Sequence, residues 1–123
     1  MKQGFIALAL LMAGTAVAQD KVEMISIAAS ETGATFWARE GSRTEQNGLI
    51  EIEGVIQKPG QENQWRTWRV SRSDCDRGHG VLWEFSMEGE QLHRNDFALG
   101  TNVTAGGIAN YVCTGRVARS KRT

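Results

Sequence analysis

From residue 22 to residue 97, short segments alternate apolar and polar residues, which is typical of β-strands with one face buried and one in water. The clearest alternation runs from 49 to 57, where three isoleucines fall on one face and Glu51 and Glu53 on the other. Gly54 interrupts this segment, and we expect a bulge or a close approach of another segment there. Turn-forming residues separate such segments about every ten positions, which favours an antiparallel sheet. The predicted strands are residues 22–28, 34–39, 49–57, 64–71, 81–86 and 91–97.

After residue 101 the apolar period lengthens to three or four residues, which indicates a helix rather than a strand. The positions that carry this period are Val103, Ile108, Tyr111 and Val112. We predict a helix over residues 102–114 that ends at Gly115. Three residues are candidates to cap its first turn: Thr101, Asn102 and Thr104. Gly106 and Gly107 each oppose the helix by about 1 kcal/mol relative to alanine, so packing has to support it.

Cys75 and Cys113 are the only two cysteines, so a single disulfide is possible. Closing a loop of about 38 residues would stabilise the fold by roughly 4 kcal/mol on the chain-entropy model. The alternative is a reactive thiol or a metal-binding pair, which needs a reducing compartment or nearby ligands. We expect an α+β fold in which an antiparallel sheet of about six strands carries one C-terminal helix, tied to the sheet by this disulfide.

The first 18 residues have the anatomy of an export signal. Lys2 precedes an apolar run from 5 to 13, and residues 16–18 (Ala-Val-Ala) offer the small-x-small pattern that signal peptidase cleaves. The alternative is a transmembrane anchor, which needs about 20 apolar residues, so we expect no transmembrane span. The predicted organisation is a cleaved signal peptide at 1–18, a single exported domain at 19–115 and a basic flexible tail at 116–123. The protein is then periplasmic or secreted.

Lysine and arginine balance aspartate and glutamate, with 14 of each, so the chain has no global basic field for nucleic acid. We therefore expect no nucleic-acid partner. The one asymmetry is the tail, which holds four cations and no acid. Such a tail could dock on anionic lipid or polysaccharide, or it could be a solvated terminus.

Groups for catalysis or metal binding are scarce. A zinc site could be assembled from His79 and His93 with Asp74 or Asp76, but the paired spacing of zinc-binding histidines is absent. His79, between two glycines, is expected in a loop, and His93 is expected on the solvent side of a strand. A Ser-His-Asp set lacks the Gly-x-Ser-x-Gly turn that exposes such a serine. We predict no catalytic residues, no metal and no cofactor.

Four tryptophans are many for so small a domain. Alternation along 64–71 places Trp68 on one face of a strand and Trp65, Thr67 and Arg69 on the other, so both faces carry a tryptophan. Tryptophan and arginine are enriched at the centres of binding surfaces. We predict that Trp65, Thr67 and Arg69 form a partner-binding face. The alternative is that a dimer mate covers this face, which makes a homodimer possible.

Three runs of the chain resemble the bacterial surface-adhesin protein E-like family. They are residues 68–80 (WRVSRSDCDRGHG), 94–97 (RNDF) and 102–113 (NVTAGGIANYVC). The resemblance implies an exported leader, a small antiparallel sheet and a C-terminal helix tied to it by one disulfide, here Cys75–Cys113. It also implies a binding protein with no catalytic set, because the family's named member is an adhesin that engages host matrix and plasma proteins. The chain differs in lacking a lipidation cysteine in its leader.

Three hypotheses follow, and we place a non-enzymatic exported binding protein first. Its partner would be a host matrix protein or a protein of the bacterial envelope. The second hypothesis is a periplasmic inhibitor or immunity protein that blocks an enzyme cleft with a loop, either 58–63 or 74–80. The third is a small hydrolase or metal enzyme, which stoichiometric zinc would support.

Overall fold

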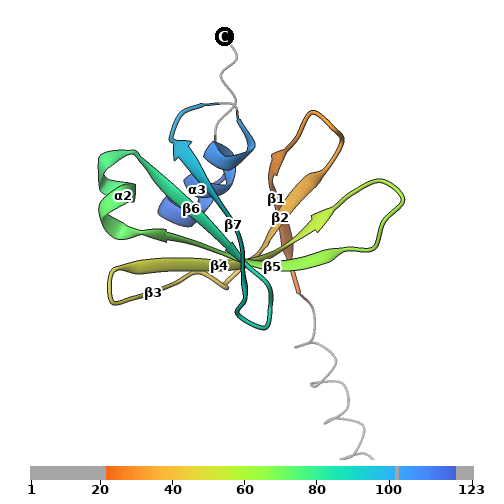
Figure 1. The fold of residues 1–123 in the computed structure, drawn as a ribbon, viewed down its shortest axis with the longest axis horizontal. Helices are drawn as coiled ribbons and strands as arrows, with labels where there is room; N and C mark the ends of the chain where they lie inside the picture. The colour runs from red at the N-terminus through yellow and green to blue at the C-terminus, as the bar shows by residue number, and fades with distance from the viewer. Residues whose placement is uncertain (1–21, 102, 119–123) are drawn as a thin grey trace, which may run out of the picture.

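The computed structural model describes residues 22–101 and 103–118. The predicted signal peptide, the first residue of the predicted helix and residues 119–123 of the predicted tail lie outside the described residues. The elements in chain order (Figure 1) are β1 (Met24–Ala29), β2 (Thr35–Arg39), β3 (Thr44–Gln46), β4 (Leu49–Gln57), β5 (Gln64–Ser71), α2 (Arg72–Arg77), β6 (His79–Phe85), β7 (Gln91–Ala98) and α3 (Thr104–Thr114).

The strands form one antiparallel sheet in the order β1-β2-β4-β5-β6-β7, and β3 also pairs with β4. This confirms the expected α+β class and all six predicted strands. The seventh strand, β3, lies in a segment that the pattern predicts as a loop. All three of its residues are exposed, so it carries no apolar alternation. Asn47 (φ 54°) and Gly48 (φ 78°) turn the chain into β4, as in a two-residue hairpin turn.

The segment between β5 and β6, predicted as a polar loop, instead contains the short helix α2. Ser71 caps its start, since its hydroxyl accepts a hydrogen bond from the Asp74 backbone N–H at 3.2 Å. Gly78 ends it in the left-handed conformation with φ 86°. None of its residues is buried, so it has no apolar period, and only the two caps mark it in the sequence.

Helix α3 begins two residues later than predicted and ends at Gly115 as predicted. Its N-cap is Val103, which makes no side-chain cap. Thr101 and Thr104, two of the expected caps, bond elsewhere: their hydroxyls donate to the carbonyls of Ala98 at 2.9 Å and Ala29 at 3.0 Å. At the other end, the Arg43 guanidinium donates to the carbonyls of residues 112 and 113, both at 2.8 Å, which satisfies the last turn.

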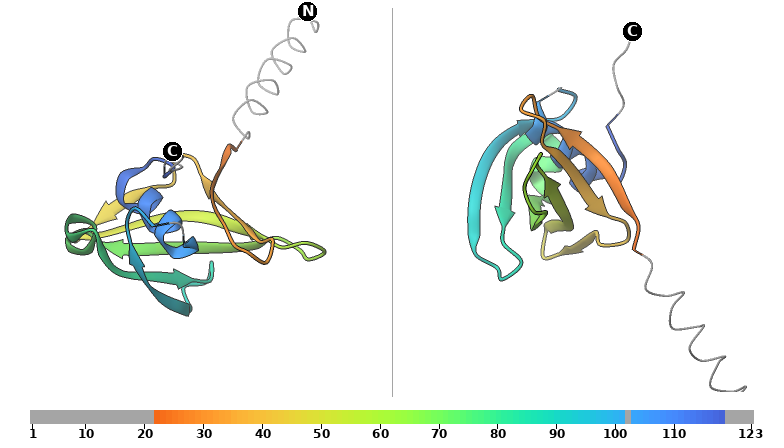
Figure 2. Two further views of the ribbon diagram at one scale, coloured as in Figure 1. Left: turned by 90° about the horizontal axis from the view of Figure 1, so that it is seen from above. Right: turned by 90° about the vertical axis from the view of Figure 1, so that its right-hand side faces the viewer.

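The sheet curves around α3, which lies on its concave side and contacts both edge strands, β1 and β7 (Figure 2). The two glycines that oppose helix formation are the residues at these contacts. A Cβ on Gly106 would lie 2.9 Å from the Ala98 carbonyl oxygen, and one on Gly107 would lie 3.1 Å from the Ile27 carbonyl oxygen. The glycine pair therefore lets one helix approach both edges of an open sheet.

The core lies between α3 and the inner face of the sheet. Its largest fully buried side chains are Trp68, Ile50, Ile52, Val70 and Val112. Gly54, on β4, stays small because a Cβ there would collide with the Trp37 carbonyl and the Trp68 ring. The pairing of β4 with β5 is continuous through Gly54, so of the two expectations at this position the close approach is correct and the bulge is wrong.

A disulfide joins Cys75 and Cys113, which are 38 residues apart with their Cα atoms at 5.4 Å. The predicted pairing is thereby confirmed. Cys113 lies near the end of α3, and Cys75 lies in α2, directly after β5. The bridge therefore fastens the helix to the sheet through a second, shorter helix. Disulfides of this kind persist in oxidising compartments rather than in the reducing cytosol, which indicates a non-cytoplasmic protein.

Candidate functional site

Strand β5 places Trp65, Thr67 and Arg69 on the outer, convex face of the sheet, as the alternation predicts. Trp68, which lies between Thr67 and Arg69 in the strand, points to the inner face and has no exposed surface, whereas Trp65 is 43% exposed. The difference arises because α3 covers only the inner face. Of the three residues that the sequence assigns to a partner, Trp65 is exposed, and Thr67 and Arg69 are half-buried.

A tryptophan from another strand lies in register with Trp65. Trp65 pairs with Val55 on β4, and Val55 pairs with Trp37 on β2. Val55 is only 4% exposed although it points to the outer face, because the two tryptophans flank it. The Trp37 indole N–H donates to the Thr35 hydroxyl at 3.0 Å, which fixes its orientation. The two indoles stand two strands apart, about 10 Å at ordinary strand spacing.

Arginines lie over aromatic rings on the neighbouring strands. Arg69 stands 4.3 Å from the centroid of Phe85, and Arg94 stands 5.0 Å from the centroid of Trp83. The Arg69 Nε also donates to the Glu51 carboxylate at 2.7 Å. Such contacts combine cation–π attraction with a held side-chain geometry.

We call this surface the outer-face patch. Its members are Trp37, Val55, Trp65, Thr67, Arg69, Trp83, Phe85 and Arg94. Sequence reasoning found three of them and missed the rest. Alternation assigns a residue to one of two faces within a strand, but only the pairing register shows that residues of different strands share a face.

The residues proposed for a metal or catalytic site are not brought together. His79 pairs with Ala98, and His93 pairs with Glu84 at a position five residues further along β6, about 17 Å away. The pattern predicts a loop at His79, but this residue is the first of β6. His93 is exposed on β7, as the pattern predicts. Within residues 22–101 and 103–118, no group of three or more His, Cys, Asp or Glu is arranged to hold a metal ion.

Asp74 has a structural role in the chain after β5. Its carboxylate accepts the Val81 backbone N–H at 3.1 Å and pairs with Arg77, and it lies directly over Gly80. Together with the disulfide at Cys75, these contacts fasten α2 to the start of β6. The segment 74–80 is therefore not a free loop.

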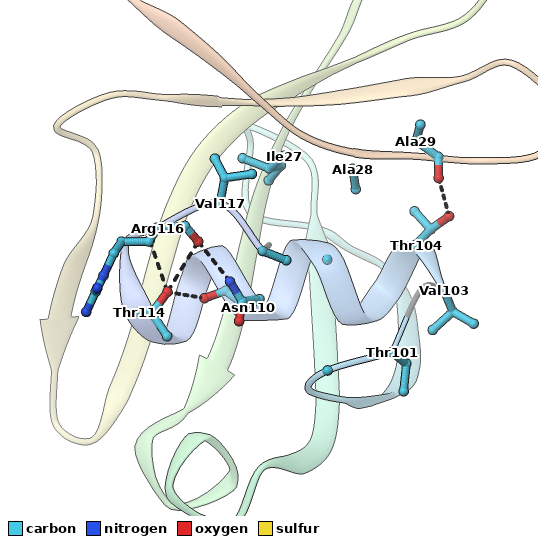
Figure 3. Close-up of a pocket in the computed structure, with 13 residues that line it drawn as sticks. Ile27, Ala28, Ala29, Thr101, Val103, Thr104, Asn110, Thr114, Arg116 and Val117 are labelled. Carbon is cyan, nitrogen blue, oxygen red and sulfur yellow. Dashed lines mark hydrogen bonds between the residues drawn. The ribbon is translucent and has the colours of Figure 1, made fainter. Parts of the chain in front are cut away.

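Two open hollows flank α3. The larger, about 1000 Å³, lies between β1, α3 and residues 116–118 (Figure 3). Three of its polar side chains are already engaged. Asn110 donates to the Arg116 carbonyl at 2.9 Å, and the Thr114 hydroxyl donates to the Asn110 carbonyl at 2.8 Å. The hydroxyl of Thr104 donates to the Ala29 carbonyl across the same hollow. This arrangement ties the helix to its surroundings and leaves few polar groups to orient a ligand.

The smaller hollow, about 550 Å³, opens between the N-terminal turn of α3 and the inner sides of β6 and β7. Glu84 lines it, and its carboxylate accepts hydrogen bonds from Arg66 Nε at 2.8 Å and from the Trp68 indole at 3.4 Å. The Glu84 charge is thus compensated within the fold. Pairing together with hydrogen bonding is the usual arrangement for a charge that is partly removed from water, as the half-buried Glu84 is.

An ion pair between Arg72 and Glu45 joins β3 to α2 at one end of the sheet. Arg72 donates to the Glu45 carboxylate at 2.7 Å and 3.2 Å. This hydrogen bonding holds the pKa of Glu45 below its usual value and raises that of Arg72. The pair connects the short strand to the helix at a solvent-exposed position.

No helix within the described part of the chain is long and apolar enough to cross a membrane. Comparison with protein-family models, with curated proteins and with solved structures finds no match for this chain.

Proposed function

We propose that the protein is an exported, non-enzymatic binding protein that engages a protein partner through the outer-face patch. The observation that supports this best is the pair of tryptophans on β5, of which one is completely buried and the other, Trp65, is 43% exposed on the outer face, where Arg69 of the same strand lies over Phe85. The partner is a host matrix protein or a protein of the bacterial envelope. The resemblance to the surface-adhesin protein E-like family and the predicted export signal support the same function.

The patch has the physical properties of a recognition surface. Tryptophan, tyrosine and arginine dominate the energetics of protein interfaces, especially near their centres. Here the side chains are also pre-organised, because Arg69 is held by both Glu51 and Phe85 and Trp37 is held by Thr35. Side chains that are already ordered lose little entropy on binding, so more of the contact energy contributes to affinity.

Site-specific photo-cross-linking tests this function. A photoreactive residue replaces Thr67, at the centre of the patch, or Gln46, an exposed residue of β3 that serves as the matched control. We expect position 67 to cross-link a discrete protein from envelope extract or from host matrix, and we expect Trp65→Ala to abolish that product. Cross-linking of the same proteins from both positions, or of none from position 67, would contradict the proposal.

One observation favours a second candidate, a periplasmic inhibitor. The hairpin of β4 and β5 extends beyond the rest of the sheet (Figure 1), and every residue of its connection, 58–63, is exposed. This loop has the protruding shape needed to enter an enzyme cleft. A photoreactive residue at Glu62 distinguishes the two functions, because an inhibitor would cross-link one bacterial enzyme from position 62 and not from position 67.

A further inference from the structure

Helix α3 meets both edge strands near their ends, but the rest of each strand differs in exposure. At the β1 edge, Thr104 donates to the Ala29 carbonyl and Gly107 approaches the Ile27 carbonyl, and four of the six residues of β1 are buried or half-buried. At the β7 edge, contact with α3 and its preceding loop is at the end of the strand, where Thr101 donates to the Ala98 carbonyl. The preceding positions 93–96 are exposed. An uncovered edge strand is a template for pairing with another strand.

Alternation identifies which backbone groups of β7 face outward. The Leu99 N–H donates to the Gly78 carbonyl at 2.9 Å, so the backbone N–H and C=O groups of residues 99 and 97 point toward β6. The backbone groups of the alternate residues, 98, 96 and 94, point away from β6, and these include Arg94 and Asp96. The N–H and C=O groups of both residues are therefore available at the open edge.

A second copy of the chain can pair with this edge about a two-fold axis only in certain registers, because edge-facing residues must oppose each other. One such register places Arg94 opposite Arg94 of the second copy, and another places Asp96 opposite Asp96 of the second copy. Both bring like charges together, which destabilises a strand pair. The intermediate register places Arg94 opposite Asp96 of the second copy, and the symmetry repeats this opposite-charge pair.

We propose that β7 is a homodimer interface in which two copies pair antiparallel with Arg94 of each opposite Asp96 of the other. Arg94 and Asp96 share the outer face, since Arg94 lies over Trp83 there and Asp96 is two residues along the strand. Neither forms an ion pair with any residue that the structure describes. The dimer joins the two sheets edge to edge and places both outer-face patches on one continuous convex surface.

The interface is short, so the dimer dissociates on dilution. Sedimentation equilibrium of the predicted mature chain, residues 19–123, over a range of concentrations measures this. We expect Asp96→Arg to weaken the dimer about tenfold, because it replaces two attractive pairs with two repulsive ones. Arg94→Asp should have the same effect. The double variant Arg94→Asp/Asp96→Arg exchanges the charges and should restore dimerisation to near the wild-type level.

Glu88→Arg, at an exposed turn between β6 and β7, is the matched charge control and should leave the dimer unchanged. Far-ultraviolet circular dichroism checks that each variant is folded. A wild-type protein that stays monomeric at millimolar concentration would overturn the proposal. So would a double variant as weakly associated as the single ones, since this would exclude the register. The inference is independent of the proposed function, because Trp65→Ala should abolish partner cross-linking and leave the dimer intact.

Discussion

Two tryptophans on β5, three residues apart, lie in opposite environments. Trp68 is fully buried on the inner face, where it packs against Phe36 with ring centroids 6.3 Å apart and donates to Glu84. Trp65 is 43% exposed on the outer face beside Val55. The strand and the residue type are the same, so neither explains the difference. What differs is the layer above each face: α3 covers one, and no described element covers the other.

The largest effect is expected from truncation of the inner tryptophan, which tests this comparison directly. Trp68→Ala should lower the free energy of unfolding by about 3–5 kcal/mol, since it opens a cavity in the core and leaves Glu84 with one bond fewer. Urea unfolding followed by circular dichroism measures the change. Trp65→Ala is the matched control, and an equal loss in the two variants would show that the two faces are not energetically distinct.

Removal of the disulfide tests what holds the inner layer in place. Cys75→Ser/Cys113→Ser should lower stability by about 2–4 kcal/mol, because the unfolded chain regains the freedom that the loop closure removes. Thermal unfolding of the variant and the oxidised protein measures this. Alkylation followed by mass spectrometry should find no reactive thiols in the protein purified without reductant. Two alkylated cysteines there would show that the inner layer is not covalently fastened.

Alanine substitutions at the two glycines of α3 separate a steric collision from the helix preference of alanine. Gly106→Ala should destabilise by about 1–3 kcal/mol, since its Cβ would collide with Thr101 and the Ala98 carbonyl. Gly107→Ala meets the Ile27 carbonyl at 3.1 Å, and the helix preference of alanine, about 1 kcal/mol, offsets this tighter contact. Chemical unfolding should thus give Gly106→Ala a clearly lower free energy of unfolding than Gly107→Ala. The reverse order would contradict the proposed helix placement.

Truncation of the outer tryptophan should change stability little. We expect Trp65→Ala to cost less than about 1 kcal/mol, in the range of ordinary surface substitutions. Acrylamide quenching of tryptophan fluorescence provides the sharper measurement, because the wild-type protein should have a readily quenched component that Trp65→Ala loses. If all four indoles were shielded in a monomeric protein, the outer-face patch would not be available to a partner.

The smallest expected effect is at the exposed pair Glu45–Arg72. Because the pKa of Glu45 is lower in the folded chain than in the unfolded one, its contribution to stability is present above the unfolded value and is lost as the pH falls through the folded value. NMR titration of Glu45 should show the lowered pKa, and Arg72→Gln should return it toward the usual value. High salt should reduce the difference, since the pair is exposed. An unchanged titration in Arg72→Gln would remove the assigned cause.

The local signals in the sequence were sufficient for most elements. The alternation around Glu51 and Glu53 predicted β4, and Gly115 predicted the end of α3, because each depends on residues close in the chain. The same local signals do not reveal β3 and α2, because neither has a fully buried residue and so neither has an apolar period. Alternation assigned Trp65 to a face but could not place Trp37 on the same face across Val55, since that arrangement depends on the register between β2, β4 and β5.

The amino-acid sequence by itself determined the α+β class, the single possible disulfide and the division of β5 into two faces, because strand alternation, helix period and cysteine number are properties of the chain alone. Only the tertiary structure decided that α3 covers one face, that Gly106 and Gly107 bring it against both edge strands, and that β7 stays open where Arg94 and Asp96 lie. These features depend on contacts between segments far apart in the chain, and a residue's position in its own strand carries no information about what packs above it.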